Sequence, residues 1–222
     1  MNISMFDILG PIMIGPSSSH TAGAQRIGKA MYMIAGPNIT DVKFYLHGSF
    51  HLTLSGHGTD RALVAGILGM DACDPKIKDS LDIAREKGVS VHFEGADLGD
   101  VHPNTVRIVA TCADGSQNTL MGSSIGGGNI QLVEINDIPA NFSGKFPSLV
   151  ITHLDRLGII SNITRILADN KVNIVTVLHS RENKGKAATT MIETDNPISP
   201  EVKSLLSHLD YITNVVTMDK FI

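Results

Sequence analysis

The last third of the sequence alternates short apolar runs with amphipathic repeats in an order that leaves few folds open. Ile160, Ile163, Ile166 and Leu167 recur at helical spacing, and Ser199-Pro200 is typical of a helix start. The expected strands cover 148–152, 173–180, 187–194 and 215–218, and the expected helices cover 159–170 and 199–208. The resulting order, βαββαβ, predicts a ferredoxin-like unit.

The preceding part of the chain has no such simple order, and its pattern predicts a mixed α+β domain. Helices are expected at 21–35, 60–68 and 76–87, and strands at 42–47, 89–93, 105–113, 117–121 and 130–135. Periodicity does not decide between helix and strand for 49–54. The stretch 136–145 is rich in turn formers and interrupts two apolar segments. We therefore expect two domains, 1–145 and 146–222.

Composition excludes several classes of function. The net charge of −4 and the aromatic content of 5% argue against a nucleic-acid-binding surface. Two cysteines cannot by themselves close a four-cysteine zinc or iron–sulfur site, so no metal centre is expected within this chain. Cys73 and Cys112 lie in no cysteine motif and are interpreted as packing residues. With neither a signal peptide nor a membrane span in the pattern, we expect a cytoplasmic protein.

The segment Pro16-Ser17-Ser18-Ser19-His20-Thr21 stands directly before the first expected helix. Hydroxyl groups and free backbone N–H groups at a helix N-terminus favour a carboxylate or a phosphate. A single serine there is usually only a helix cap. Three serines followed by histidine and threonine exceed what capping needs, which favours a binding site.

The segment Ser55-Gly56-His57-Gly58-Thr59-Asp60 places a histidine between two glycines. The glycines leave space for a ligand to approach the imidazole, which can exchange a proton near pH 7, and Asp60 could orient the ring. An ordinary glycine turn followed by an Asp-capped helix explains the same letters equally well.

Three further patterns carry weaker signals. The loop 97–104, with His102-Pro103-Asn104, and the turn 123–128 are each explained by ordinary connections between strands. Gly122-Ser123-Ser124-Ile125-Gly126 matches a hydrolase nucleophile elbow by letter, but that elbow requires a helix directly afterwards, and a strand is expected instead. His47, His51 and His57 fit no known zinc spacing.

Taken together, Gly15 to Thr21, Gly56 to Asp60, His102-Pro103-Asn104 and Ser124 to Gly128 resemble the β subunit of bacterial iron–sulfur L-serine dehydratases of the two-chain type. The βαββαβ unit, with Asp155-Arg156-Leu157-Gly158, resembles an ACT domain, an amino-acid-sensing module. The N-terminal domain of this family is also similar to the allosteric substrate-binding domain of some phosphoglycerate dehydrogenases. These resemblances cover nearly the whole chain.

The resemblance implies conversion of L-serine to pyruvate and ammonia with a [4Fe–4S] cluster held by cysteines of a partner α subunit. One iron of that cluster acts as a Lewis acid on the substrate. His57 is then the candidate for proton transfer, and Asp7 is the candidate for orientation. The expected substrate-binding residues are Ser17, Ser18, Ser19, His20, Thr21, Gly56, Gly58, Thr59 and Asp60.

For the ACT part, the resemblance implies an amino-acid site at 153–162, with Asp155, Gly158 and Asn162 as candidate residues. A competing interpretation makes the ACT unit a surface for homodimerisation only. At the level of the whole chain, the alternative to a catalytic subunit is a serine-sensing regulatory or assembly module. A stand-alone pyridoxal-phosphate lyase is disfavoured, because no lysine lies in a distinctive glycine-rich context.

Overall fold

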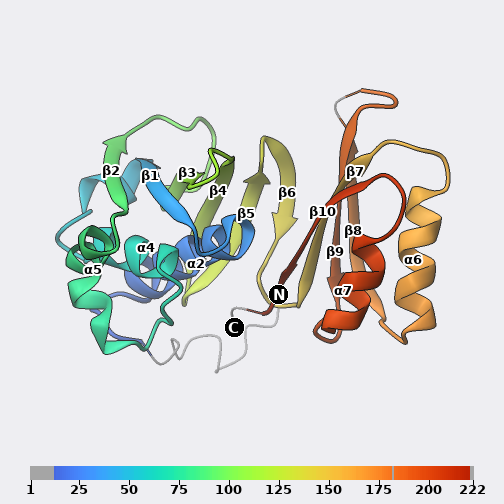
Figure 1. Cartoon of the computed structure of the whole chain (residues 1–222). Coiled ribbons are helices and arrows are strands. Elements are labelled where there is room, and N and C mark those ends of the chain that lie inside the picture. The colour runs from blue at the N-terminus through green and yellow to red at the C-terminus, as the bar shows by residue number, and fades with distance from the viewer. Residues whose placement is uncertain (1–12, 182, 221–222) are drawn as a thin grey trace. The chain divides into compact units, whose positions relative to one another are not determined.

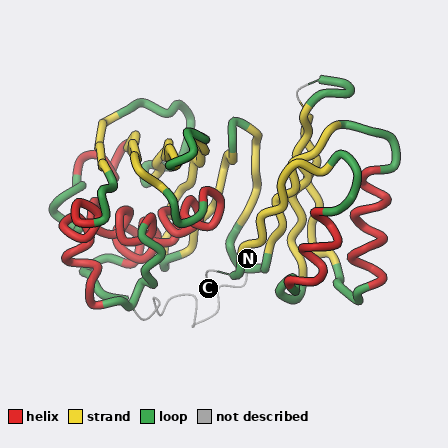
Figure 2. Tube along the Cα trace, in the orientation of Figure 1, coloured by secondary structure: helices red, strands yellow, loops and turns green. Residues whose placement is uncertain are grey.

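The computed structural model describes residues 13–181 and 183–220, which divide into two compact units at Asp137/Ile138. Asp7 therefore lies outside the described residues. Both units combine helices with one sheet, which confirms the expected α+β class (Figures 1 and 2).

The first unit is built on a mixed sheet. The order of its strands is β2-β1-β3-β4-β5. The β1–β2 pair is parallel, whereas β1–β3, β3–β4 and β4–β5 are antiparallel. The strands of this unit are β1 (Ile39–Leu46), β2 (Ser90–Gly95), β3 (Thr105–Cys112), β4 (Gln117–Gly126) and β5 (Asn129–Ile135).

Helices of the first unit pack on its sheet because every second strand residue is apolar and buried. Val42, Phe44 and Leu46 of β1 show this alternation, and α2 contacts β3, β4 and β5 as well as α4. The helices are η1 (Ser18–Gly23), α2 (Ala24–Ala35), α3 (Gly48–Leu52), α4 (Thr59–Ile67), η2 (Pro75–Asp79) and α5 (Ser80–Glu86). Within the described chain, no helix is long and apolar enough to cross a membrane.

Two expected helices differ in detail from the structure. The helix expected at 21–35 begins earlier, with the π-helical turn η1 continuing into α2. The helix expected at 76–87 is divided into the 3-10 helix η2 and the α-helix α5, with Asp79 and Ser80 at the junction. The Ser80 hydroxyl at this junction donates to the Arg61 carbonyl of α4 at 2.8 Å, which ties the break to the neighbouring helix. The undecided stretch 49–54 contains most of helix α3.

The stretch expected to be only a connection contains a strand, β6 (Ile138–Phe142), which begins the second unit and contacts β8 and β9. Phe142 is buried, and Ile138 and Ala140 are partly buried. Asn and Pro between these residues concealed the alternation. The compact units therefore divide at Asp137/Ile138, earlier in the chain than the domain boundary expected after Lys145. The domain boundary itself stays a prediction.

The second unit has the expected βαββαβ order and an antiparallel sheet with strand order β10-β7-β9-β8. Both helices lie on the same side of this sheet (Figure 1) and bury Leu149, Ile151, Ile163, Ile192 and Leu206. The elements are β7 (Ser148–Leu154), α6 (Ile159–Asp169), β8 (Ile174–Arg181), β9 (Ala187–Thr194), α7 (Pro200–Ser207) and β10 (Ile212–Met218).

Candidate functional site

The serine-rich segment folds onto its own helix start. The Ser17 side chain caps η1 by accepting a hydrogen bond from the His20 N–H at 3.2 Å, and the Thr21 N–H donates to the Ser17 carbonyl at 2.8 Å. The Ser17 and Ser19 hydroxyl oxygens lie 3.2 Å apart. A serine cap, the alternative to a binding site in the sequence interpretation, is therefore present, and the Ser17 and Ser19 hydroxyls lie beside the His20 ring.

His20 is held on both edges of its imidazole. Its Nδ1 lies 3.0 Å from the Ser19 Oγ and 3.4 Å from the Ser17 Oγ, and its Nε2 lies 3.0 Å from the Ser49 Oγ. The Phe50 ring packs edge-on, with the two ring centroids 5.5 Å apart. Ser49 and Phe50 belong to α3 and were missed from the sequence, because the spacing of 49–54 did not reveal a helix.

His57 lies directly beside His20. The two ring centroids are 5.2 Å apart and the rings are tilted by 44°. The Thr21 hydroxyl donates to the His57 carbonyl at 3.3 Å, which ties the loop before α4 to η1. Gly58 adopts a left-handed conformation, φ 69°, which explains the glycine at that position. Two segments far apart in the sequence thus place two imidazoles together.

The environment keeps His20 neutral. Burial lowers the pKa of His20 below its ordinary value of 6.5, and the neighbouring His57 lowers it further. His57 is exposed, and among the described residues no hydrogen bond reaches its ring nitrogens. The pair therefore combines an oriented, neutral imidazole with one whose nitrogen atoms are free to meet a ligand.

The His102-Pro103-Asn104 segment reaches this site through its backbone. The Pro103 carbonyl accepts a hydrogen bond from the Ser49 N–H at 2.8 Å, and the Asn104 carbonyl accepts one from the Ser124 N–H at 2.9 Å. The His102 Nδ1 instead accepts from the Asn104 N–H at 3.1 Å. The segment supports α3, while the His102 ring closes its own turn.

The glycine turn after β4 approaches the same helix. Gly126, Gly127 and Gly128 all have positive φ, and the Gly128 carbonyl accepts a hydrogen bond from the guanidinium of Arg26 on α2. Arg26 is buried, and no sequence pattern singled it out. The predicted strand–turn–strand around 122–128 is confirmed, which excludes the nucleophile elbow.

Two buried hydroxyls near these segments have no hydrogen-bond partner in the described structure, Thr59 Oγ1 and Ser124 Oγ. Both residues are fully buried. Thr59 begins α4 directly after Gly58, and Ser124 packs against Gly23 at the end of η1. Buried polar groups are normally hydrogen-bonded, so unpartnered hydroxyls deserve a functional explanation.

Asp60 is placed differently from the expectation that it orients His57. Its carboxylate accepts a hydrogen bond from the Arg61 N–H at 2.8 Å, within the first turn of α4. A Cβ added to Gly56 would meet only the Thr53 carbonyl oxygen, at 3.7 Å, so that side of the loop is open.

Within 13–181 and 183–220, no group of three or more His, Cys, Asp or Glu residues could hold a metal ion. The His47 Nδ1 accepts from the Leu98 N–H at 3.2 Å, and the His51 ring lies against Gly95, so these two histidines line a separate pocket from His57. Cys112 is buried as expected. The expectation of a packing role for Cys73 is wrong, because its side chain is exposed beyond the end of α4.

The second unit has a pocket of about 510 Å³ at the β7–α6 loop. It is lined by Asp155, Arg156, Leu157, Arg181, Lys184, Gly185 and Tyr211. The Asp155 carboxylate accepts hydrogen bonds from the Gly185 N–H at 3.1 Å and the Arg181 guanidinium at 2.7 Å, and these partners lower its pKa. The Arg156 guanidinium stands 5.6 Å from the centre of the Tyr211 ring.

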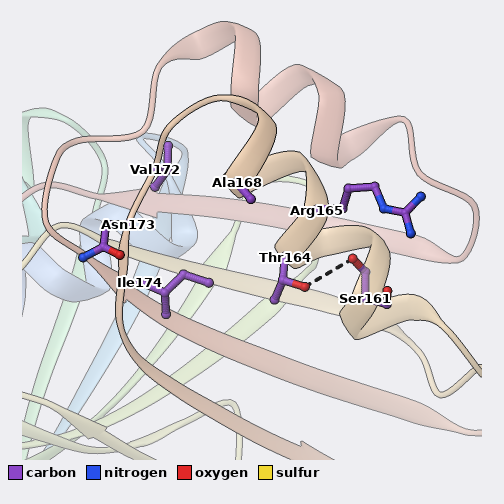
Figure 3. A pocket seen from close by; sticks show the side chains of 7 residues that line it. All are labelled: Ser161, Thr164, Arg165, Ala168, Val172, Asn173 and Ile174. Carbon is purple, nitrogen blue, oxygen red and sulfur yellow. Dashed lines mark hydrogen bonds between the residues drawn. The ribbon is translucent and has the colours of Figure 1, made fainter.

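A second hollow of this unit, about 470 Å³, lies along α6 (Figure 3). Ser161, Thr164, Arg165 and Ala168 face the start of β8, and the Thr164 hydroxyl donates to the Ser161 carbonyl at 3.2 Å. Of the three expected ACT residues, only Asp155 lines either of these hollows. Gly158 starts α6 with a left-handed conformation, φ 85°, and the Asn162 N–H donates to its carbonyl.

A pair of histidines, the buried His153 and the exposed His179, lies on the same sheet. The Thr190 hydroxyl oxygen is 2.9 Å from the His153 Nε2 and 3.0 Å from the His179 Nδ1, and the two rings stack with centroids 5.6 Å apart. His153 is fully buried. Burial and the neighbouring His153 lower the pKa of His179, against an opposing effect of Asp155.

Comparison with known proteins gives two family matches. Residues 4–83 match the family described as serine dehydratase beta chain, and residues 148–209 match the ACT domain. The chain is 41% identical to the L-serine dehydratase beta chain of Peptoniphilus asaccharolyticus, with 95% of each chain covered. It is also 41% identical to the probable L-serine dehydratase beta chain of Bacillus subtilis, covering 96% of each. A D-3-phosphoglycerate dehydrogenase of B. subtilis is 25% identical over 88% of this chain and 37% of its own length.

Proposed function

This chain belongs to the L-serine dehydratase β-chain family, and on that premise we propose that it is one subunit of an enzyme that converts L-serine to pyruvate and ammonia. The observation that carries the proposal is the pairing of His20 with His57 beneath a cluster of serine hydroxyls. The expectation of a cytoplasmic location is part of the proposal.

The reaction requires three contributions from the protein. The Cα of serine gives up a proton, the Cβ loses its hydroxyl group as water, and the resulting enamine tautomerises and is hydrolysed to pyruvate and ammonia. A group must accept the Cα proton, donors must hold the carboxylate, and water must be kept from competing. The exposed His57 ring is suited to accept the proton.

The serine-rich helix start is suited to hold the carboxylate. Ser17, Ser18, Ser19, His20 and Thr21 lie at the beginning of η1, where the helix dipole favours an anion. The His20 and Thr21 N–H groups and the Thr21 hydroxyl are bonded within the chain, so the serine hydroxyls are the candidates to hold the carboxylate. Gly56 and Gly58 leave space beside His57, and Thr59 offers a buried hydroxyl with no partner in the described chain. The Asp60 carboxylate already accepts a hydrogen bond from the Arg61 N–H, so its contribution is indirect. Asp7 stays a candidate for orientation.

A [4Fe–4S] cluster does not fit the described residues of this chain. Cys73 is exposed, Cys112 is buried on β3, and neither joins a group able to hold a metal. The proposal therefore assigns the cluster, and its Lewis-acid chemistry, to a partner α subunit.

The test is reconstitution. The chain is co-purified anaerobically with its α partner, and pyruvate formation from L-serine is measured. We expect His57→Ala to lower turnover at least about 100-fold, the usual contribution of a general acid–base group. His92→Ala, an exposed surface histidine of the same unit, is the matched control. Turnover of His57→Ala and Ser18→Ala within about twofold of wild type would refute the assignment of the site.

The second candidate function, a serine-sensing module, is favoured by the pocket beside Asp155. Calorimetry with L-serine on the full chain tests it, with Arg156→Ala in the pocket and Asn162→Ala outside it. Saturable binding that only Arg156→Ala weakens, with turnover intact, would support sensing through this pocket.

Homodimerisation through the ACT unit is the remaining part of the proposal. Strand β8 is at the edge of its sheet, and Val175 and Val177 are exposed there at 40% and 43%. Light scattering of wild type and Val177→Lys tests this interface, because a charge on an exposed edge strand opposes pairing. A dimer of unchanged stability in the variant would place the interface elsewhere.

A further inference from the structure

Neither the family matches nor the sequence motifs assign a role to Ser49. It lies on α3, outside both the serine-rich segment and the His57 loop, and its Oγ is 3.0 Å from the Nε2 of His20. We propose that Ser49 is a positioning residue that fixes the His20 imidazole opposite His57. The proposal rests on the proposed function for its catalytic consequence, but its structural part stands independently.

The first step is that Ser49 is itself fixed. Its N–H donates to the Pro103 carbonyl at 2.8 Å, and the Phe50 N–H reaches the same carbonyl at 3.5 Å. The Thr53 hydroxyl donates to the Ser49 carbonyl at 2.8 Å. Gly48 approaches Pro103 so closely that a Cβ there would lie 2.8 Å from the Pro103 carbonyl oxygen. Helix α3 is thus seated on the 102–105 segment.

The second step is that Ser49 completes the set of contacts around His20. Ser19 holds the Nδ1 edge, Phe50 packs against the ring, and His57 stands beside it. The Nε2 edge is held by Ser49. Without that hydroxyl the ring keeps hydrogen bonds at Nδ1 only, and it can rotate about its side-chain bonds.

The third step is that the position of His20 matters for His57. A neutral His20 leaves no positive charge beside His57, and its ring borders one side of the space that a substrate at His57 would occupy. Since Ser49 reaches the site only through His20, removing its hydroxyl should change turnover more than substrate binding.

The experiment compares Ser49→Ala with Ser49→Thr, which keeps the hydroxyl, and with Ser55→Ala, an exposed serine of the neighbouring loop. The first readout is the ¹⁵N NMR spectrum of the His20 side chain during a pH titration of the full chain. We expect Ser49→Ala to shift the His20 Nε2 resonance and the midpoint of its titration, because the hydrogen bond at Nε2 is lost. Ser49→Thr should restore the wild-type titration and Ser55→Ala should not alter it.

The second readout is turnover with the α partner. Ser49→Ala should lower kcat about tenfold with KM within twofold, the size of one lost hydrogen bond. Unchanged His20 NMR signals in Ser49→Ala would overturn the proposal whatever the kinetics. If every protein, wild type included, fails to deaminate serine, the proposed function fails, whereas the NMR titration still decides the role of Ser49.

Discussion

Gly28 on α2 and Gly66 on α4 face each other across the helix contact with no room for a side chain at either position. A Cβ on Gly28 would overlap the Leu63 carbonyl, and a Cβ on Gly66 would overlap the Gln25 carbonyl. Helix α2 continues from the turn that carries His20, and α4 follows the loop that carries His57. The two glycines therefore allow close packing of the two helices that follow the histidine-bearing segments.

The first prediction concerns this helix contact. Gly28→Ala should lower the free energy of unfolding by about 1–3 kcal/mol, because the backbone of α4 cannot yield without moving the helix. This loss should appear although alanine favours a helix by about 1 kcal/mol over glycine. Ala168→Ser, which adds one atom on the exposed side of α6, is the control. Urea denaturation measures the stability of both variants. A Gly28→Ala variant as stable as wild type would show that α2 and α4 can move apart without an energetic cost.

The second prediction concerns Gly23, which packs against the buried Ser124 hydroxyl. Gly23→Ala would place its Cβ in overlap with the Ser124 side chain, so we expect a loss of stability and of serine turnover. Adding Ser124→Gly to this variant removes the overlapping atoms. Thermal unfolding of the two single variants and the double variant should therefore show coupling of at least about 0.5 kcal/mol. Strictly additive effects would contradict the contact.

A third prediction follows from the lowered pKa values of His20 and His179. In the unfolded chain both imidazoles titrate near 6.5, whereas in the folded chain they hold their protons less tightly. Protonation on acidification below pH 6.5 therefore favours the unfolded state, so stability falls between that pH and the lower folded pKa values. Denaturation midpoints from pH 8 to pH 5 should show this fall, and His179→Gln should reduce its slope. An unchanged slope in His179→Gln would show that His179 does not contribute to the pH dependence of stability.

A fourth prediction concerns Asp155, whose pKa is lowered by the Gly185 N–H and by Arg181. The stability it contributes is present above its ordinary pKa of 3.8 and is lost as the pH falls through the folded value. Because Arg181 is half exposed, solvent screens the ion pair, and Asp155→Asn should lower stability only slightly. Amide exchange at Gly185 should accelerate in the variant, and Asp210→Asn is the matched control. Unchanged exchange at Gly185 would show that the contact does not hold the hairpin.

The fifth prediction uses the difference between the two cysteines. Cys73 is exposed and Cys112 is buried with its thiol 3.5 Å from the Ala35 carbonyl. An aromatic disulfide reagent should therefore modify one thiol rapidly in the folded chain and the second only after unfolding. Cys73→Ser should abolish the rapid phase and Cys112→Ser should leave it. Two rapid phases would show that β3 opens.

The ferredoxin-like unit was predictable because its apolar spacing is local and regular, as in Ile160 to Leu167. The start of α7 at Ser199-Pro200 was also readable from the sequence, since capping acts over three residues. Strand β6 was missed because Asn and Pro lie between its buried residues.

The candidate site was half predictable. Its two motifs around His20 and His57 are local in sequence, but their contact joins segments far apart in the sequence, which no local spacing reveals. Ser49, Arg26 and the Pro103 carbonyl join the site through long-range contacts. Asp60 was expected to orient His57. In the structure its carboxylate instead accepts a hydrogen bond from the neighbouring Arg61 N–H.

Both ring nitrogens of His20 meet hydroxyl groups, and a hydroxyl can either give or take a hydrogen bond. The proton of the neutral ring can consequently sit on Nδ1 or on Nε2 while every heavy atom stays in place. The direction of the hydrogen bonds from Ser17 through Ser19 and His20 to Ser49 can then reverse when protons are transferred between His20 and the hydroxyls on either side of it and the hydroxyl hydrogens rotate. A charge that appears at one end of this row would then change the direction of the hydrogen bonds at the other end without moving the backbone.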